Sequence, residues 1–212
     1  MKSYAESTWH WPTWDLFRYT VIVTLAVGVW FAVVFAGADW ITRQHALRVR
    51  VHFDAELLIP FVPASVFGYM SIYPLFAFPS FILRTRREVR ALGVTMFAVI
   101  AIGGIGFLLV PAQIAFPPAS ESTPRDCLVR IAKRVALENN LVPSLHIALS
   151  AVCICIYARR ASLFGRLAWW AWSIVIAAST MLLHQHYLVD VITGYALGLA
   201  GVRLVYDRCS AE

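Results

Sequence analysis

The chain has 212 residues, of which 60% are hydrophobic and only 14% are charged, and its mean hydropathy is +0.69. Soluble domains carry about 25% charged residues, so this composition excludes an ordinary soluble domain and favours one domain of membrane helices. The formal net charge of +6 does not indicate a nucleic-acid partner, because most arginines stand in short segments between apolar runs. Membrane topology and anionic lipid headgroups account for arginines in such segments.

Four uncharged runs follow one another along most of the chain, and a spanning helix needs about 20 such residues. A polar segment rich in tryptophan precedes them over residues 1–18, and we expect it to lie at the membrane interface. The four runs cover residues 19–38, 57–83, 91–117 and 141–158, and prolines interrupt the second of them.

The stretch between Arg166 and Arg203 carries a single formal charge, on Asp190. As one helix it would be about 54 Å long, whereas the hydrocarbon core of a bilayer is about 30 Å thick. It must therefore hold two spans with a tight reversal. The polar cluster His184-Gln185-His186 marks that reversal.

These runs together predict an all-α fold, an integral-membrane six-helix bundle over residues 19–206 with a short tail at residues 207–212. Arginines crowd the segments that follow the second, fourth and sixth spans, and the positive-inside rule places these segments in the cytoplasm. Both termini then lie in the cytoplasm, and the basic loop over residues 117–140 lies outside. We expect the protein in a bacterial inner (plasma) membrane.

His186 and Asp190 converge on the outer face that this topology predicts. They are four residues apart, which places them on one face of a helix. A carboxylate at that spacing accepts a hydrogen bond from one imidazole nitrogen and leaves the other nitrogen free to attack. His184 has Leu188 at the matching position, so the spacing favours His186 as nucleophile. A pair that only fastens two helices explains His186 and Asp190 equally well.

The motif Pro143-Ser144-Leu145-His146 opens the fourth span at the same outer face. Proline followed by serine is a pattern of helix starts, where free backbone N–H groups bind anions. In that first turn His146 could donate a proton to a leaving oxygen, although plain helix initiation explains the motif alone better. The two motifs together favour phosphoryl transfer through a phosphohistidine. We expect no metal and no other cofactor.

At these residues the sequence resembles the type 2 phosphatidic acid phosphatase (PAP2) superfamily. Residues 143–146 match the family's Pro-Ser-Gly-His motif with leucine in place of glycine. The family's Ser-Arg-x5-His-x3-Asp motif is matched in order and spacing by Ser179, Thr180, His186 and Asp190, with threonine in place of arginine. The resemblance implies a six-span core and a lipid phosphate ester as substrate.

The segment from Ile59 to Tyr73 and the two motif variants resemble one branch of that superfamily. This is the inositolphosphotransferase-like branch, which includes the inositol phosphorylceramide synthases. Water as the phosphoryl acceptor would make the enzyme a phosphatase, whereas a lipid or sugar hydroxyl would make it a phosphotransferase. We expect the phosphatase, with the phosphotransferase as the alternative.

The resemblance also implies a role for each matched residue. His186 would be the nucleophile, Asp190 would orient it, His146 would be the general acid and Ser144 would contact the phosphate.

The cationic phosphate ligands of the family are missing from this chain, because there is no Lys-x6-Arg-Pro stretch and Thr180 replaces the arginine. We expect Ser179 and Thr180 to bind the phosphate through their hydroxyls, helped by basic residues of the outer loop. These basic residues are Arg125, Arg130 and Arg134, with Lys133 beside them.

Two other functional classes fit parts of the pattern. A metal-dependent membrane enzyme would use His146, His184, His186 and Asp190 as ligands, and a chelator would inhibit it. A transporter would hold its His–Asp site near the midplane, whereas these residues lie near one end of their spans.

Other conspicuous residues have ordinary interpretations. Gly194 and Gly198 predict close packing of the last span inside the bundle. The tryptophans within residues 169–172 are expected to anchor the protein at the cytoplasmic interface. His45 and His52, beside Asp54 and Glu56 in the first outer loop, are expected to be solvated loop residues.

Overall fold

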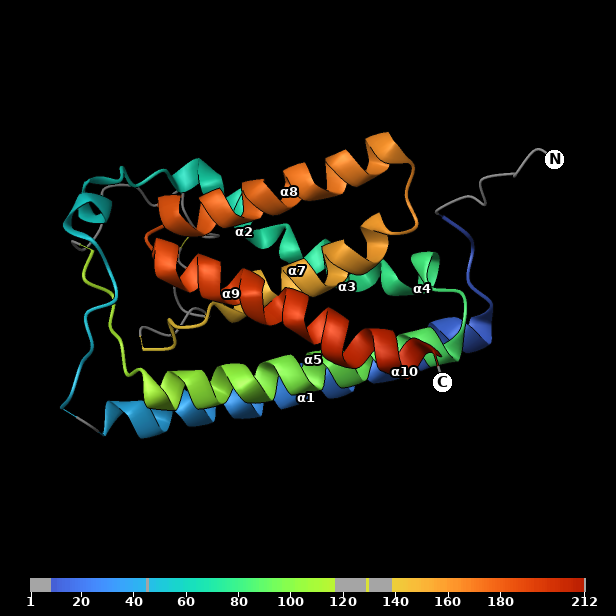
Figure 1. Cartoon of the computed structure of the whole chain (residues 1–212), viewed down its shortest axis with the longest axis horizontal. Helices are drawn as coiled ribbons and strands as arrows, with labels where there is room; N and C mark the ends of the chain where they lie inside the picture. The colour runs from blue at the N-terminus through green and yellow to red at the C-terminus, as the bar shows by residue number, and fades with distance from the viewer. Residues whose placement is uncertain (1–8, 45, 117–128, 130–138, 212) are drawn as a thin grey trace.

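The computed structural model describes residues 9–44, 46–116, 129 and 139–211 (Figure 1). Within these residues the regular structure is helical, and the one extended pairing is an isolated bridge between Val49 and Ala112. The all-α prediction is therefore confirmed for the described part of the chain.

The two longest helices are α1 (Trp14–Arg43) and α5 (Arg86–Leu109), which lie side by side along the bundle (Figure 1). α1 begins where the Thr13 hydroxyl accepts a hydrogen bond from the Leu16 amide at 3.2 Å, a cap that satisfies one free N–H group. Its contact with α5 includes the stacked rings of Trp30 and Phe97. α1 is therefore longer at both ends than the run of residues 19–38.

The second apolar run forms a chain of short helices in place of one continuous span. Prolines start two of these helices, at the first position, where the missing N–H group of proline costs no helical hydrogen bond. The helices are η1 (Asp54–Leu58), η2 (Pro63–Ser65), α2 (Val66–Met70), α3 (Ile72–Ala77) and α4 (Pro79–Ile82).

The C-terminal part forms α7 (Leu145–Ala158), α8 (Leu163–Leu182) and α9 (Leu188–Gly201). α9 continues without a break through the π-helical turn η3 (Val202–Tyr206) into α10 (Asp207–Ala211). α8 ends before the cluster of residues 184–186 and α9 begins after it, so the predicted reversal is confirmed.

α7 is the centre of the bundle and is buried along nearly its whole length. α9 packs directly against it, because a Cβ atom at Gly194 would lie 2.6 Å from the Ser144 carbonyl oxygen, and one at Gly198 would lie 2.4 Å from that of Ala148. Only glycine permits this approach of two helix backbones. The predicted close packing of the last span is confirmed.

Three described helices are long and apolar enough to cross a membrane, namely Trp14–Arg43, Arg86–Leu109 and Leu188–Ala211. This is consistent with a membrane protein, and the count of six spans remains a prediction.

The expected role of the tryptophans was wrong for Trp169. Its ring is buried against Tyr157 and Phe78, and the nearby Trp172 indole donates a hydrogen bond to the Ser71 hydroxyl at 2.7 Å. These rings fill the space between α8 and the short helices, because a chain of short helices leaves gaps that large side chains can occupy.

Candidate active site

His186 and Asp190 are in contact, although not on one face of a helix as predicted. Tyr187 is the N-cap of α9, so His186 lies in the turn before the helix and Asp190 lies in its first turn. The Asp190 carboxylate reaches back and accepts hydrogen bonds from the Tyr187 amide at 2.9 Å and from His186 Nδ1 at 3.2 Å. The pair therefore forms as part of a helix cap rather than as a side-chain pair along a helix.

This contact fixes the chemistry of the His186 ring. An ionised carboxylate only accepts hydrogen bonds, so Nδ1 carries the proton and Nε2 keeps its lone pair. Asp190 is fully buried, and its Oδ1 atom has no hydrogen-bond partner among the described residues. His186 is 8% exposed, so its free nitrogen is shielded from bulk water.

Thr180 holds His186 in place through its backbone. Its carbonyl oxygen, at the end of α8, accepts from the Gln185 amide at 2.9 Å and from the His186 amide at 3.3 Å. The hydroxyls of Ser179 and Thr180 donate within α8, to the carbonyls of Ile176 at 2.6 Å and Ala177 at 2.8 Å. These hydroxyls can still accept a hydrogen bond, and substrate contact by them remains a prediction.

Ser144 joins the two motifs. It is the N-cap of α7, where its hydroxyl accepts from the Ile147 amide at 3.3 Å. Its own amide donates to the backbone carbonyl of Asp190 at 3.1 Å. The start of α7 and the start of α9 are therefore tied together by the main chain, which keeps the two motifs in register.

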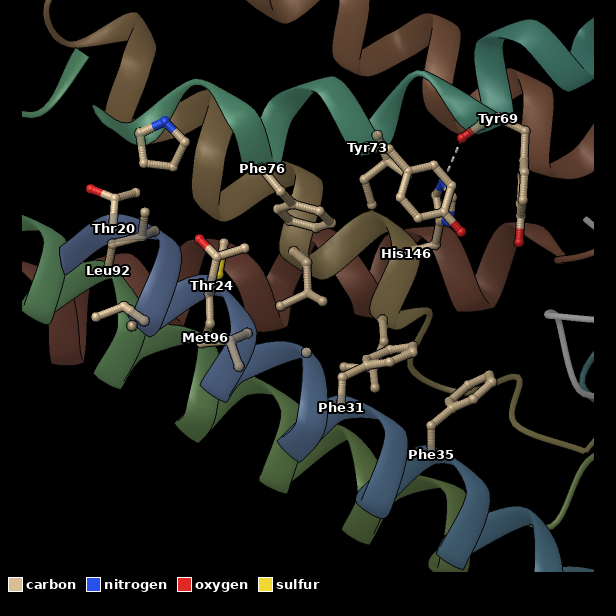
Figure 2. A pocket seen from close by; sticks show the side chains of 18 of the residues that line it. Thr20, Thr24, Phe31, Phe35, Tyr69, Tyr73, Phe76, Leu92, Met96 and His146 are labelled. Atoms are coloured by element: carbon tan, nitrogen blue, oxygen red, sulfur yellow. Dashed lines mark hydrogen bonds between the residues drawn. The ribbon is translucent and has the colours of Figure 1, made fainter. Parts of the chain in front are cut away.

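His146 lies in the first turn of α7 and contacts α2 (Figure 2). Its Nε2 atom is 3.0 Å from the Tyr69 carbonyl oxygen, and its ring stacks on the Tyr69 ring with centroids 4.2 Å apart. A carbonyl only accepts hydrogen bonds, so Nε2 carries a proton and Nδ1 is left to exchange one. Tyr69 is not predicted from the sequence, because no motif in its broken apolar run points to the start of α7.

His184 has other partners at the reversal. Its backbone is left-handed, with φ of 58°, which is uncommon for a residue other than glycine. Its Nε2 atom is 2.8 Å from the Ile59 carbonyl oxygen, and its ring stacks on Phe116 at 4.1 Å. Across the part of the chain that the structure describes, no three His, Cys, Asp or Glu side chains gather closely enough to hold a metal ion.

Glu56, in the first outer loop, is buried, with only 7% of its surface exposed. One carboxylate oxygen accepts from the amide of Leu188, the first residue of α9, at 2.6 Å. The other accepts from the Phe53 amide at 2.7 Å. Free N–H groups at a helix start favour a carboxylate partner, so the outer loop is fastened to the helix that carries Asp190.

A cavity of about 260 Å³ opens at the two histidines. It is lined by His146 and His186, together with Asn140 and Gln185 at the same end. Figure 2 shows its walls, with α1 on one side and α3 on the other. Both motif histidines therefore face one space.

The predicted loop ligands Arg125, Arg130 and Arg134, and Lys133 with them, lie outside the described residues. Two described arginines at the same end of the bundle are paired with acids. Arg43 Nε lies 2.7 Å from an oxygen of Asp39, and Arg50 pairs with Asp54.

The sequence pattern of the PAP2 superfamily matches residues 38–204, a range that contains both motifs. The chain belongs to the PAP2 superfamily. PAP2 proteins are generally phosphatases or phosphotransferases, so membership indicates phosphatase-type activity. Neither a curated protein nor a solved structure matches the chain.

Proposed function

We propose that this PAP2 protein is an integral-membrane phosphatase that cleaves a lipid phosphate ester through a phosphohistidine on His186, without a metal. The main observation that supports the proposal is the hydrogen bond from His186 Nδ1 to the Asp190 carboxylate. It leaves the Nε2 lone pair free beside the cavity that His146 also lines.

The reaction has two balanced steps. In the first, His186 Nε2 attacks phosphorus, the ester P–O bond breaks, and His146 gives a proton to the leaving oxygen. In the second, water attacks the phosphohistidine, the P–N bond breaks, and His146 takes up the proton of the water. Because His146 Nε2 already donates to the Tyr69 carbonyl, the transferred proton is a second one on Nδ1, so His146 enters the first step as an imidazolium and is neutral between the two steps.

Phosphate contacts in this proposal come from neutral and basic groups around the histidines. Ser144, Ser179 and Thr180 are the nearest candidates by motif position, together with the N–H groups in the first turn of α7. Arg125, Arg130 and Arg134 are proposed as the cationic ligands that replace those of the family. We place the site on the outer face of a bacterial inner membrane, in a bundle of six spans.

The alternative is a phosphotransferase of the inositolphosphotransferase-like branch. The same His186 intermediate would pass a phosphoryl group or a phospho-headgroup to an alcohol in place of water. Thr180 in place of the motif arginine favours this alternative, as does the segment from Ile59 to Tyr73, which contributes the Tyr69 contact to His146.

The test uses purified protein in detergent with a chelator present. A panel of lipid phosphates is assayed with and without diacylglycerol or ceramide as acceptor. Free phosphate as product identifies the phosphatase, whereas a new phospholipid identifies the phosphotransferase. Inhibition by the chelator would contradict the metal-independent mechanism.

The covalent step is tested on the same preparation by trapping acid-labile phosphate on the protein. We expect His186→Ala to abolish both trapping and turnover, and His184→Ala, at the neighbouring histidine, to retain trapping. A near-wild-type rate for His186→Ala would rule out the phosphohistidine.

A further inference from the structure

The cavity at the histidines extends far beyond the site. Its lining residues on α1 run from Phe35, near the site, to Thr20, close to the other end of the bundle (Figure 2). These two positions are separated by about 22 Å along the helix, roughly two-thirds of the hydrocarbon thickness of a bilayer. The cavity is therefore a long shaft that starts at the reactive groups.

The walls of the shaft are apolar away from the site. α1, α3, α5 and α7 supply its middle and far parts, and six of these lining residues are Val27, Phe31, Phe76, Leu92, Met96 and Leu149. Thr20, at the far end, donates its hydroxyl proton to the Leu16 carbonyl at 2.9 Å, so that donor is already satisfied. The shaft therefore suits a hydrocarbon along most of its length, with a polar group at the histidines.

The volume limits what the shaft can hold. A volume of about 260 Å³ lies below the usual range of about 300–1,000 Å³ for ligand pockets, although the shaft is long. A long cavity of small volume is narrow, so it fits one extended chain better than two chains side by side. Thr24 and Gly28 of α1 line the shaft and are exposed on the surface, which provides an entrance from the bilayer.

We propose that the shaft binds the single hydrocarbon chain of a lipid phosphate, with the phosphate at His186 and the chain running towards Thr20. The preferred substrate class is then a single-chain phosphate, alkyl, acyl or isoprenoid, rather than a lipid with two acyl chains. This assignment of the substrate rests on the proposed function, and binding of the chain can be tested without turnover.

α1 offers a matched pair of positions for the test. A Cβ atom at Gly28 or at Gly37 meets nothing within 4 Å, but only Gly28 lines the shaft. Leucine is a better helix former than glycine, so neither substitution weakens α1. Gly28→Leu narrows the shaft near its middle, and Gly37→Leu is the control with the same chemical change outside it.

The first measurement is kcat/KM for butyl phosphate and hexadecyl phosphate. Wild type is expected to prefer the longer chain. Gly28→Leu should lose about tenfold with hexadecyl phosphate, the equivalent of two buried methylene groups, and little with butyl phosphate. Gly37→Leu should match wild type with both. Equal losses at both chain lengths, no loss, or faster turnover of a two-chain phosphatidic acid would overturn the proposal.

The second measurement is the melting temperature in detergent with hexadecyl phosphate or hexadecanol. The phosphate should stabilise wild type and Gly37→Leu more than Gly28→Leu. Stabilisation without turnover would refute the proposed function and leave the shaft assignment standing. Turnover that does not depend on residue 28 would refute the shaft assignment and leave the proposed function standing. Equal stabilisation by hexadecanol would mean that the shaft holds any bilayer hydrocarbon, which would overturn the substrate assignment.

Discussion

The two ends of the bundle contain the same kinds of groups in different arrangements. At the end where the described chain starts and finishes, arginines pair with acids of other helices, and these pairs are Arg86 with Asp15, Arg159 with Asp207 and Arg160 with Glu88 (Figure 1). At the opposite end, the pairs Arg43 with Asp39 and Arg50 with Asp54 are local, between residues four apart, and the buried acid Asp190 pairs with a histidine. An arginine pair only holds helices together, because arginine cannot exchange its proton at neutral pH. A histidine pair keeps a free lone pair, and here it faces a cavity.

The two ends of the bundle also contain similar helix caps. Serine caps α7 at the histidine end and α8 at the arginine end, in each case accepting an amide hydrogen bond at 3.3 Å. Glutamates accept amide hydrogen bonds at the start of α9 and at the start of α5. The same substitution can therefore be made at both ends. A loss of stability is expected at either end, whereas a loss of activity is expected only at the histidine end.

The largest effect is expected for Asp190→Asn compared with Asp207→Asn. A single Asp190 oxygen, Oδ2, accepts from both the Tyr187 amide and His186 Nδ1, so an asparagine with its oxygen at that position keeps both hydrogen bonds. It loses the negative charge that stabilises the His186 ring, which becomes positive when Nε2 bonds to phosphorus, and kcat should fall by about 10³-fold. Asp207→Asn should change kcat less than about twofold, since it weakens only an exposed pair.

Both rates are measured on the same lipid phosphate, with binding followed separately. Equal activity in the two variants would remove Asp190 from the mechanism and would make its contact with His186 a structural pair like those at the arginine end.

The next effect is expected for Glu56→Gln compared with Glu88→Gln. Glu56→Gln turns one of the two accepting oxygens into a donor and leaves a partly buried N–H group unpaired, at a cost of about 1–3 kcal/mol. In Glu88 one oxygen accepts from two exposed amides and the other pairs with Arg160, so Glu88→Gln weakens that ion pair. Only Glu56 holds the helix that begins beside Asp190, so we expect Glu56→Gln to lower kcat by about tenfold, the equivalent of about 1.4 kcal/mol. Glu88→Gln should lower the melting temperature alone.

Thermal unfolding in detergent and initial rates are measured for both glutamate variants. If Glu56→Gln melts earlier and keeps full kcat, then the contact with Leu188 stabilises the fold without positioning the site.

A smaller effect is expected for Ser144→Ala compared with Ser162→Ala. Loss of an N-cap costs about 1 kcal/mol, so both variants should unfold at similarly lowered temperatures. Ser144 is also proposed to contact the phosphate, so its variant should raise KM severalfold while Ser162→Ala leaves KM unchanged. Identical KM values for the two variants would restrict Ser144 to capping.

The smallest effect is expected for Arg86→Ala. Both partners of its pair with Asp15 are more than half exposed, and exposed pairs contribute about 0–1 kcal/mol. We expect a slight fall in melting temperature and unchanged kinetics, measured alongside wild type. A clear loss of activity would show that the two ends of the bundle are coupled.

The sequence by itself determined the helical character, the reversal at residues 184–186 and the choice of motif residues. Apolar runs of spanning length, a charge-free stretch too long for one helix, and two motifs in the right order carry this information locally. The glycine spacing in α9 also predicted its close packing, because glycine at that spacing has few other uses in an apolar helix.

The tertiary structure decided how these residues meet. Sequence spacing placed His186 and Asp190 on one helical face, but the helix begins one residue after His186, and the contact is a cap. Tyr69 and Glu56 reach the site from segments about 77 and 132 residues away in the chain, and local patterns contain no signal for such partners. The shaft likewise exists only because α1, α3, α5 and α7 pack together, since a cavity belongs to the space between helices and not to any one of them.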